Sequence, residues 1–333
     1  MFNAIKAVQK GAGAAALGLA MALPAGSANA QDKPLAEITY LLPAPAQAIA
    51  FAPFMLAQSK HLYEKEGLSV RFVTVKGGAD VGKQLGAGNG QLGGALGDTP
   101  IILRQNGIPV KGVALLGGHA LHQLMTREDR HINKPADLKG KTLTVMAYQD
   151  TSFYATLAIL AKGGLTQNDV HVQAAGPTGI WQQVALGKAD GLVGAPEMGA
   201  FAEEAGAKLK WESTGDFFPG MAQAIMASDD YIKSHPDVIR KFVSATLKSL
   251  AQVQANPDEA AAEYIKAVPA YKGREALVKQ VMEYYAKNVY PGQKVLGEFN
   301  ADRVNALQDF YLHNNIIRNK LKASDVFTNE FVK

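Results

Sequence analysis

Apolar residues along the chain alternate between two spacings. Short apolar or alternating runs are typical of strands, whereas longer stretches with an apolar residue every three or four positions predict helices. The expected strands are residues 37–42, 68–75, 91–96, 110–116, 142–145, 170–174 and 191–193. The expected helices are residues 54–66, 81–88, 133–139, 153–162, 180–186, 236–253, 257–267, 274–288 and 301–314, with one more beginning at Asp98-Thr99-Pro100. This alternation predicts an α/β architecture.

The order of elements restarts near the middle of the chain. Strands and helices before about residue 120 are followed by a similar series after residue 133, without a recognisable sequence repeat. From residue 229 onward the pattern is mostly helical. A chain of 333 residues with 47% hydrophobic residues is long enough to bury a core in each of two lobes. The pattern therefore predicts two α/β halves and a helical C-terminal region.

The first 30 residues have the pattern of a secretory signal peptide. Lys6 and Lys10 provide a positive start, residues 11–23 are apolar, and Ala28-Asn29-Ala30 matches a small-x-small cleavage site. Cleavage after Ala30 would begin the mature chain at Gln31. A membrane anchor is the alternative, but the apolar run of about a dozen residues is shorter than the roughly 20 needed to span a bilayer.

Composition excludes several classes of chemistry. The sequence has no cysteine, which rules out disulfides, cysteine nucleophiles, thiolate metal sites and a lipid-anchored cysteine. The formal net charge of +4 is not gathered in a basic run, so no nucleic-acid partner is expected. No histidine or acidic cluster has metal-ligand spacing, and no Gly-x-Ser-x-Gly or His-Glu-x-x-His motif is present. We expect no metal, no other cofactor and no catalysis. A soluble periplasmic protein fits best.

Several segments, in order, resemble one known family. Residues 52–57 read APFMLA, residues 62–70 read LYEKEGLSV, residues 138–142 read LKGKT and residues 185–191 read ALGKADG. Together with a late helical stretch at residues 236–260, they resemble the NMT1/THI5-like periplasmic binding proteins over nearly the whole mature chain. That family includes binding components for sulfonates, taurine, nitrate and thiamine-precursor pyrimidines.

The resemblance implies a fold and a function. It implies a periplasmic binding protein of type II, in which each lobe is a sheet flanked by helices. Lobe one would take residues 34–120 and 221–333, and lobe two residues 121–220. A monomer would close by a hinge on a small molecule in the cleft. It would then deliver this molecule to an ABC permease in the inner membrane.

Several classes of ligand are compatible with the sequence. A small organic anion, a sulfonate or carboxylate with or without an aromatic body, is the first expectation. A thiamine-precursor pyrimidine is the alternative. A pyrimidine-synthesising enzyme of the same fold, or a sensor, is less favoured. Where the family often has Trp-Glu-Pro, this chain has Ala195-Pro196-Glu197, which indicates a different pocket.

Candidate ligand contacts combine polar side chains near helix starts with aromatic side chains. The candidates are Gln47, Phe51, Thr99, His119, Tyr148, Gln149, Thr151, Ser152, Trp181, Glu197 and Phe218. Thr99, Thr151 and Ser152 stand at expected helix starts, where backbone amides and hydroxyls favour an anion. Simple helix capping is the alternative for all three.

The other candidates have equally plain alternatives. Gln47 lies where the family contacts ligand, or is a solvated loop residue; Phe51, Trp181 and Phe218 stack on a flat ligand or pack a core. His119, or His122 close behind it, follows a strand and would donate to an anion, mark the hinge or lie on the surface. Tyr148 and Gln149 precede the lobe-two helix and are within reach of the cleft. Glu197 would bind an amine or hydroxyl, or be a surface carboxylate.

Overall fold

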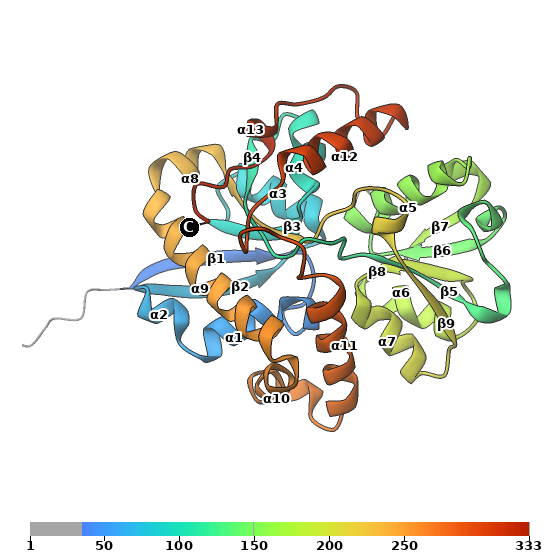
Figure 1. The fold of residues 1–333 in the computed structure, drawn as a ribbon, viewed down its shortest axis with the longest axis horizontal. Coiled ribbons are helices and arrows are strands. Elements are labelled where there is room, and N and C mark those ends of the chain that lie inside the picture. The colour runs from blue at the N-terminus through green and yellow to red at the C-terminus, as the bar shows by residue number, and fades with distance from the viewer. Residues whose placement is uncertain (1–34, 149, 333) are drawn as a thin grey trace, which may run out of the picture. The chain divides into compact units, whose positions relative to one another are not determined.

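Two five-stranded sheets form the framework of the chain (Figure 1). The computed structural model describes residues 35–148 and 150–332, so the predicted signal peptide lies outside the described residues. The first sheet has the order β2-β1-β3-β10-β4. Its strands are β1 (Ala36–Leu42), β2 (Leu68–Thr74), β3 (Leu92–Leu96), β4 (Val110–Leu115) and β10 (Gln223–Ser228).

The second sheet repeats the plan of the first. Its order is β7-β6-β8-β5-β9, with β5 (Gln123–Arg127), β6 (Thr142–Val145), β7 (His171–Ala174), β8 (Gly191–Gly194) and β9 (Leu209–Ser213). In each sheet the fourth strand, β10 or β5, runs antiparallel to both neighbours while the first three pair in parallel. The chain therefore crosses between the sheets twice, from β4 to β5 and from β9 to β10. The expected two-lobed α/β fold is confirmed.

Helices flank both sheets. Those that follow strands of the second sheet are α5 (Thr151–Lys162), α6 (Gly176–Ala185) and α7 (Pro196–Glu204). The others are α1 (Ala52–Ser59), α2 (Leu62–Lys65), α3 (Gly78–Gly86), α4 (Thr99–Gln105), α8 (Asp229–Ser234), α9 (Pro236–Ala255), α10 (Pro257–Ala267), α11 (Glu275–Asn288), α12 (Ala301–His313) and α13 (Ala323–Val326). Among the described residues, no helix is both long and apolar enough to cross a membrane.

Several elements differ from the sequence-based expectation. The helix expected at residues 54–66 is broken into α1 and α2, because His61 adopts a left-handed conformation with φ of 55°. Strands β5, β9 and β10 and helix α7 were not expected. Helix α7 carries Gly199 in its middle, which weakens its helical signal. This glycine is required by packing, since a Cβ there would lie 2.2 Å from Sδ of Met125 in β5.

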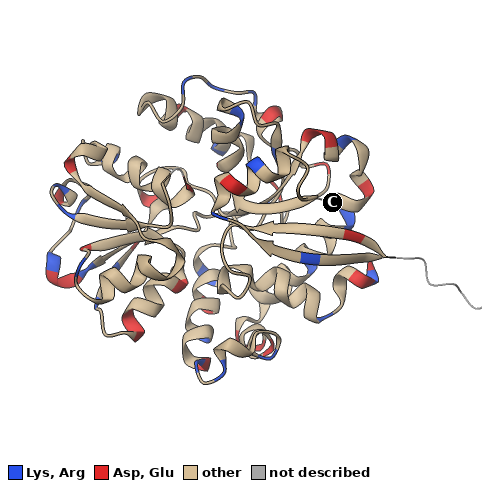
Figure 2. Cartoon of the chain, turned by 180° about the vertical axis from the view of Figure 1, so that it is seen from behind, with Lys and Arg blue, Asp and Glu red and all other residues tan. Residues whose placement is uncertain are grey.

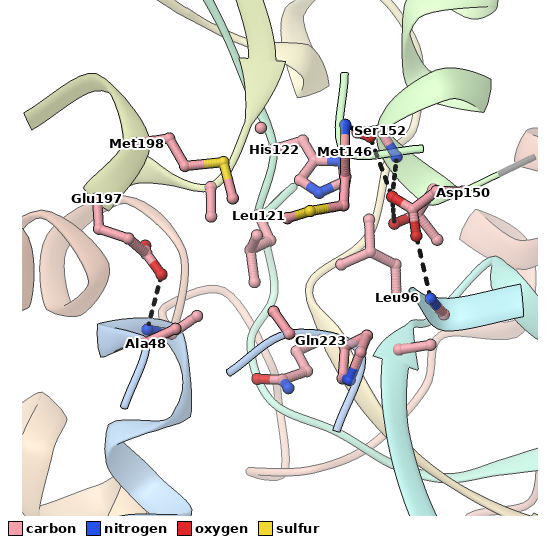
Figure 3. A pocket seen from close by; sticks show the side chains of 18 of the residues that line it. Ala48, Leu96, Leu121, His122, Met146, Asp150, Ser152, Glu197, Met198 and Gln223 are labelled. Carbon is pink, nitrogen blue, oxygen red and sulfur yellow. Dashed lines mark hydrogen bonds between the residues drawn. The ribbon is translucent and has the colours of Figure 1, made fainter. Parts of the chain in front are cut away.

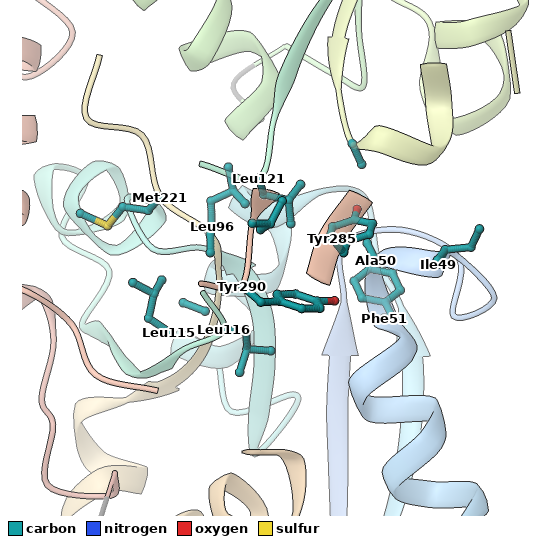
Figure 4. Close-up of a cluster of buried hydrophobic side chains, with 14 of the residues drawn as sticks. Ile49, Ala50, Phe51, Leu96, Leu115, Leu116, Leu121, Met221, Tyr285 and Tyr290 are labelled. Carbon is teal, nitrogen blue, oxygen red and sulfur yellow. The ribbon is translucent and has the colours of Figure 1, made fainter. Parts of the chain in front are cut away.

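Aromatic side chains fill the core between the first sheet and helices α1 and α9. The Phe242 ring stacks on Tyr40 at 5.0 Å and on Tyr63 at 4.9 Å, and Phe54 packs against Tyr40 at 4.8 Å between ring centroids. A second buried group, including Phe51, Tyr285 and Tyr290, lies where α11 meets the loop after β1 and the crossing segments (Figure 4). These contacts fix the strand ends and the loop that border the site described below.

Charged residues of both signs are interspersed over the helices and loops (Figure 2). The recorded ion pairs among the described residues are mostly on the surface, as in Lys279–Asp258 at 2.8 Å. Exposed pairs of this kind add little to stability, typically below about 1 kcal/mol. The positions that matter for the site are the buried charges instead.

Candidate ligand-binding site

A pocket lies between the two sheets, at the ends of their strands (Figure 3). The cavity has a volume of about 80 Å³. Its wall is drawn from both sheets and from the first crossing segment: Pro43, Ala44, Ala48, Ala50, Phe51, Gly78, Ala95, Leu96, Leu121, His122, Met146, Asp150, Thr151, Ser152, Ile180, Gly194, Ala195, Glu197, Met198 and Gln223. Strand ends beside a crossover are the usual location of ligand sites in open α/β sheets.

Most of the pocket wall is apolar. Leu96, Leu121, Met146 and Met198 line it (Figure 3), and the Phe51 ring belongs to the same lining. Methionine side chains adapt to irregular shapes and make favourable contacts with aromatic rings. No lysine or arginine belongs to the lining formed by the described residues. The wall thus favours an apolar or aromatic surface over an isolated charge.

The carboxylate of Asp150 occupies the polar end of the pocket. It caps α5, where Oδ1 accepts hydrogen bonds from the Ser152 amide at 3.1 Å and the Ser152 hydroxyl at 3.0 Å. Its Oδ2 accepts a hydrogen bond from the Gly78 amide at the start of α3, at 3.0 Å. Amides at helix N-termini favour negative charge. The place where two helix starts would hold an anion is therefore taken by the protein's own carboxylate.

The backbone on the α3 side is shaped to receive Asp150. Gly77 has φ of 84°, and a Cβ there would lie 2.7 Å from Oδ2 of Asp150. Glycine alone combines this conformation with room for the carboxylate. The contact joins a helix that follows the first sheet's β2 to one that follows the second sheet's β6.

Glu197 makes a second carboxylate link between the same two halves. It lies in the first turn of α7 and is 2% exposed. Its Oε1 accepts from the Ala50 amide at 3.2 Å, and its Oε2 accepts from the Tyr285 hydroxyl at 2.7 Å. Burial raises the pKa of Glu197 above the usual range, and the two donors oppose that rise. Both pocket carboxylates are thus already hydrogen-bonded within the chain.

Two further polar side chains belong to the lining. His122 is 8% exposed, and its Nδ1 has no hydrogen-bond partner among the described residues. Burial lowers the pKa of His122 to about 4, against the opposing effect of Asp150, so the ring is neutral at pH 7. Gln223, the first residue of β10, is 5% exposed, and no hydrogen bond of its side chain is recorded among the described residues.

Four of the predicted contacts are brought together in this pocket: Phe51, Thr151, Ser152 and Glu197. Thr99 lies beside it, on a small cavity of about 10 Å³ that it shares with Thr151, and its buried hydroxyl oxygen has no partner among the described residues. The expected cap at Asp98 is absent, because its Oδ2 accepts from the Tyr311 hydroxyl instead.

The remaining candidates lie elsewhere. Gln47 is exposed, and its carbonyl accepts from the Tyr264 hydroxyl at 2.8 Å. Tyr148 is 57% exposed, and its hydroxyl donates to a β7 carbonyl at 3.0 Å. His119 is exposed, near Gly292.

Two aromatic candidates pack against other aromatic side chains. Trp181 packs edge-on against Phe201 with ring centroids 5.8 Å apart. Phe218 stacks on Phe310, also at 5.8 Å. Neither belongs to the pocket lining. Gln149 lies outside the described residues.

The sequence analysis did not single out Asp150 or Gln223, and it named His122 only beside His119. Asp150 carries a recognisable signal, since aspartate before a helical run is a preferred N-cap. Gln223 has no local signal, because it enters the pocket only through the pairing of β10 with β3 and β4.

Comparison with known proteins adds the family. Residues 48–260 match the family model described as NMT1/THI5 like. The riboflavin-binding protein RibY of Chloroflexus aurantiacus is 29% identical over 298 residues, covering 85% of this chain and 83% of that protein. A putative aliphatic sulfonates-binding protein of Bacillus subtilis is 25% identical, covering 85% of each chain.

A solved structure shares the fold. The alkanesulfonate-binding protein SsuA of Xanthomonas axonopodis pv. citri, bound to MOPS, superimposes with a TM-score of 0.67 at 18% identity. The superposition covers 89% of this chain and 98% of that one. At this identity the likeness is one of fold. With the family match over well over half of its length, the chain belongs to the NMT1/THI5-like family, whose relatives named above are ligand-binding proteins.

Proposed function

We propose that this protein is the solute-binding component of an ABC importer in a bacterial periplasm, and that its solute is an uncharged planar heterocycle. The observation that carries the proposal is the chemistry of the pocket between the sheets. Its walls are apolar, it has no lysine or arginine among the described lining residues, and its two carboxylates are already hydrogen-bonded. Riboflavin is the first candidate, since the RibY relative is named for binding it.

An uncharged ligand follows from the cost of burying charge. An anion placed between Leu96, Leu121 and Met198 would lose its hydration without gaining a positively charged partner from the described lining residues. A flat, uncharged ring system has few polar groups to desolvate, so its burial costs little free energy. It also gains contact with Phe51 and the two methionines. The thiamine-precursor pyrimidine expected as an alternative falls within the same chemical class.

The mechanism that fits this site is closure of two lobes about the crossing segments. Lobe one would comprise residues 34–120 and 221–333, and lobe two residues 121–220. Asp150 to Gly78 and Glu197 to Tyr285 would then be bonds that stabilise the closed state. A solute that contacts both halves would shift the balance toward closure, and the permease would recognise the closed form.

An organic anion is the second candidate. The Bacillus subtilis relative and the SsuA structure are named for sulfonates, which favours this class. For such an anion to use the starts of α3 and α5, Asp150 would have to leave Gly78 and Ser152. An enzymatic role is less favoured, since the RibY and Bacillus relatives are binding proteins by name.

The test is a titration of the mature protein, residues 31–333, after denaturation and refolding to remove any bound ligand. Riboflavin, an aminopyrimidine and an alkanesulfonate are added separately while heat and flavin fluorescence are followed. We expect one-to-one binding of a heterocycle with no product formed, and no heat from the sulfonate. Binding of the sulfonate alone would refute the proposed ligand class. Turnover of a bound heterocycle would refute a pure binding role.

A further inference from the structure

His122 and Gln223 lie on the two segments by which the chain crosses between the sheets. These segments are hydrogen-bonded to each other: the Leu116 amide donates to the Gln223 carbonyl at 2.7 Å, and the Leu121 amide donates to the Met221 carbonyl at 3.1 Å. Both side chains line the pocket (Figure 3). Gln223 begins β10 of the first sheet and His122 directly precedes β5 of the second, so the pair spans the hinge where the two crossing segments meet.

Each side chain is held in place by its surroundings. The carbonyl of His122 accepts from the amide of Thr214 at 3.2 Å and from its hydroxyl at 2.9 Å, which anchors the backbone that carries the imidazole. The Gln223 carboxamide rests against the bare backbone of Gly94, where an added Cβ would lie 3.2 Å from Nε2. A ligand group that meets these side chains would thus meet preset positions.

Both side chains are polar and nearly buried, and neither has a recorded side-chain hydrogen bond among the described residues. A buried polar group without a partner is costly, and native proteins satisfy more than about nine in ten of them. The pocket's carboxylates, by contrast, already accept hydrogen bonds from the chain, from Gly78, Ser152, Ala50 and Tyr285. A neutral imidazole offers one donor nitrogen and one acceptor nitrogen, and a carboxamide offers an acceptor oxygen and two N–H donors.

We propose that His122 and Gln223 are the specificity-determining pair of the pocket, and that they recognise a lactam or imide edge, a ring N–H flanked by carbonyl oxygens. The inference rests on the proposed function, since it names the chemistry by which the uncharged heterocycle is chosen. A carboxamide meets adjacent N–H and C=O groups with two parallel hydrogen bonds, as it does on a base edge. The imidazole then pairs with the next carbonyl along the same edge.

The experiment compares four variants with two ligands. The ligands are riboflavin, which carries an imide N–H, and 3-methylriboflavin, in which a methyl group replaces that hydrogen. His122→Phe and Gln223→Met remove the polar atoms at similar size, His122→Gln restores hydrogen-bonding capacity, and His119→Phe is the matched control, at an exposed histidine outside the pocket lining. Dissociation constants come from flavin fluorescence, and each variant's fold is checked by circular dichroism and thermal unfolding.

We expect wild-type protein to bind riboflavin at least tenfold more tightly than 3-methylriboflavin. His122→Phe and Gln223→Met should each lose about tenfold for riboflavin, which corresponds to about 1.4 kcal/mol, and change little for the methyl derivative. His122→Gln should recover most of the loss, and His119→Phe should leave binding of both ligands unchanged within about threefold, because surface substitutions away from a site have small effects. This pattern would show that His122 and Gln223 recognise the imide edge of the ligand.

Other outcomes distinguish a failure of the role given to His122 and Gln223 from a failure of the proposed function. Riboflavin binding that is unaffected by both polar substitutions would overturn the pair and leave the proposed function standing. Binding of the aminopyrimidine without binding of riboflavin would also overturn the pair and leave the proposed function standing, whereas absence of binding of either heterocycle by wild-type protein would overturn both. If a variant does not fold, the ¹⁵N shifts of the His122 ring in wild-type protein replace it: a change at a ring nitrogen on riboflavin binding supports the pair, and no change at either nitrogen overturns it.

Discussion

Replacing Tyr285 with phenylalanine removes a single oxygen from the link between the two halves of the protein. Tyr285 is fully buried in α11, and its hydroxyl donates to Oε2 of Glu197 at 2.7 Å. The ring stays in contact with Tyr290, at 5.6 Å between centroids. The substitution therefore creates almost no cavity and tests the hydrogen bond alone.

The expected loss follows from the charge of the partner. A hydrogen bond to an ionised group contributes about 1.5–3 kcal/mol, and leaving a buried carboxylate short of a donor costs a similar amount. Glu197 would keep only the Ala50 amide, at 3.2 Å. We expect the free energy of unfolding of the Tyr285→Phe variant to fall by about 2–3 kcal/mol at pH 8.

The loss should depend on pH, with a definite sign. The pKa of Glu197 is raised in the folded protein, so the folded state holds a proton that the unfolded chain has already released. The free energy of unfolding therefore falls as pH rises from about 4.5 through the folded pKa. Removing the donor raises that pKa further, so the difference between variant and wild type should grow from pH 5 to pH 8.

Urea unfolding at pH 5 and pH 8, followed by circular dichroism, measures both quantities. Tyr63→Phe is the matched control, because its buried hydroxyl pairs with the neutral Thr246 hydroxyl at 2.9 Å. This control should lose about 1 kcal/mol at either pH. A Tyr285→Phe loss that is no larger than the control, or that is the same at both pH values, would refute the reasoning.

Three further predictions concern the crossings and a second buried acid. Arg303→Ala removes the hydrogen bonds donated to the carbonyls of Gly118 and Gly220, one on each crossing, and should speed amide hydrogen exchange in both; unchanged exchange would contradict this. Burial raises the pKa of Asp98 to about 6, so the wild-type free energy of unfolding should fall between pH 4 and pH 6, and urea titrations of Asp98→Asn should show a smaller fall over this range. Gly117→Ala places a Cβ 2.4 Å from a backbone oxygen at φ of 142° and should lower stability by more than about 2 kcal/mol, measured by thermal unfolding.

The predicted secondary structure was most accurate where local signals decide it. The strand at Thr142–Val145 and the helix at Pro257–Ala267 agree with the structure to the residue. The helix has proline at its first position and an asparagine cap, and such signals act within a few residues. The missed strands β5, β9 and β10 are short, and each is stabilised by partners distant along the chain.

The candidate site shows the same difference between residues with a local sequence signal and contacts that depend on distant parts of the chain. Helix starts mark Thr151 and Ser152, and the resemblance to the family points to Glu197, so the sequence alone indicates them. The sequence does not reveal the hydrogen bonds that the site residues make within the chain. The donors to the Asp150 and Glu197 carboxylates, Gly78 and Tyr285, are 72 and 88 residues away.

The sequence by itself determined the α/β class, the family and most helix and strand positions, because periodicity, capping residues and ordered motifs are local properties. Only the tertiary structure decided the character of the pocket. Hydrogen-bond partners are set by which segments fold against one another, and this pairing leaves His122 and Gln223 open while it satisfies both acids. The charge that the pocket can accept is therefore a property of the assembled lobes.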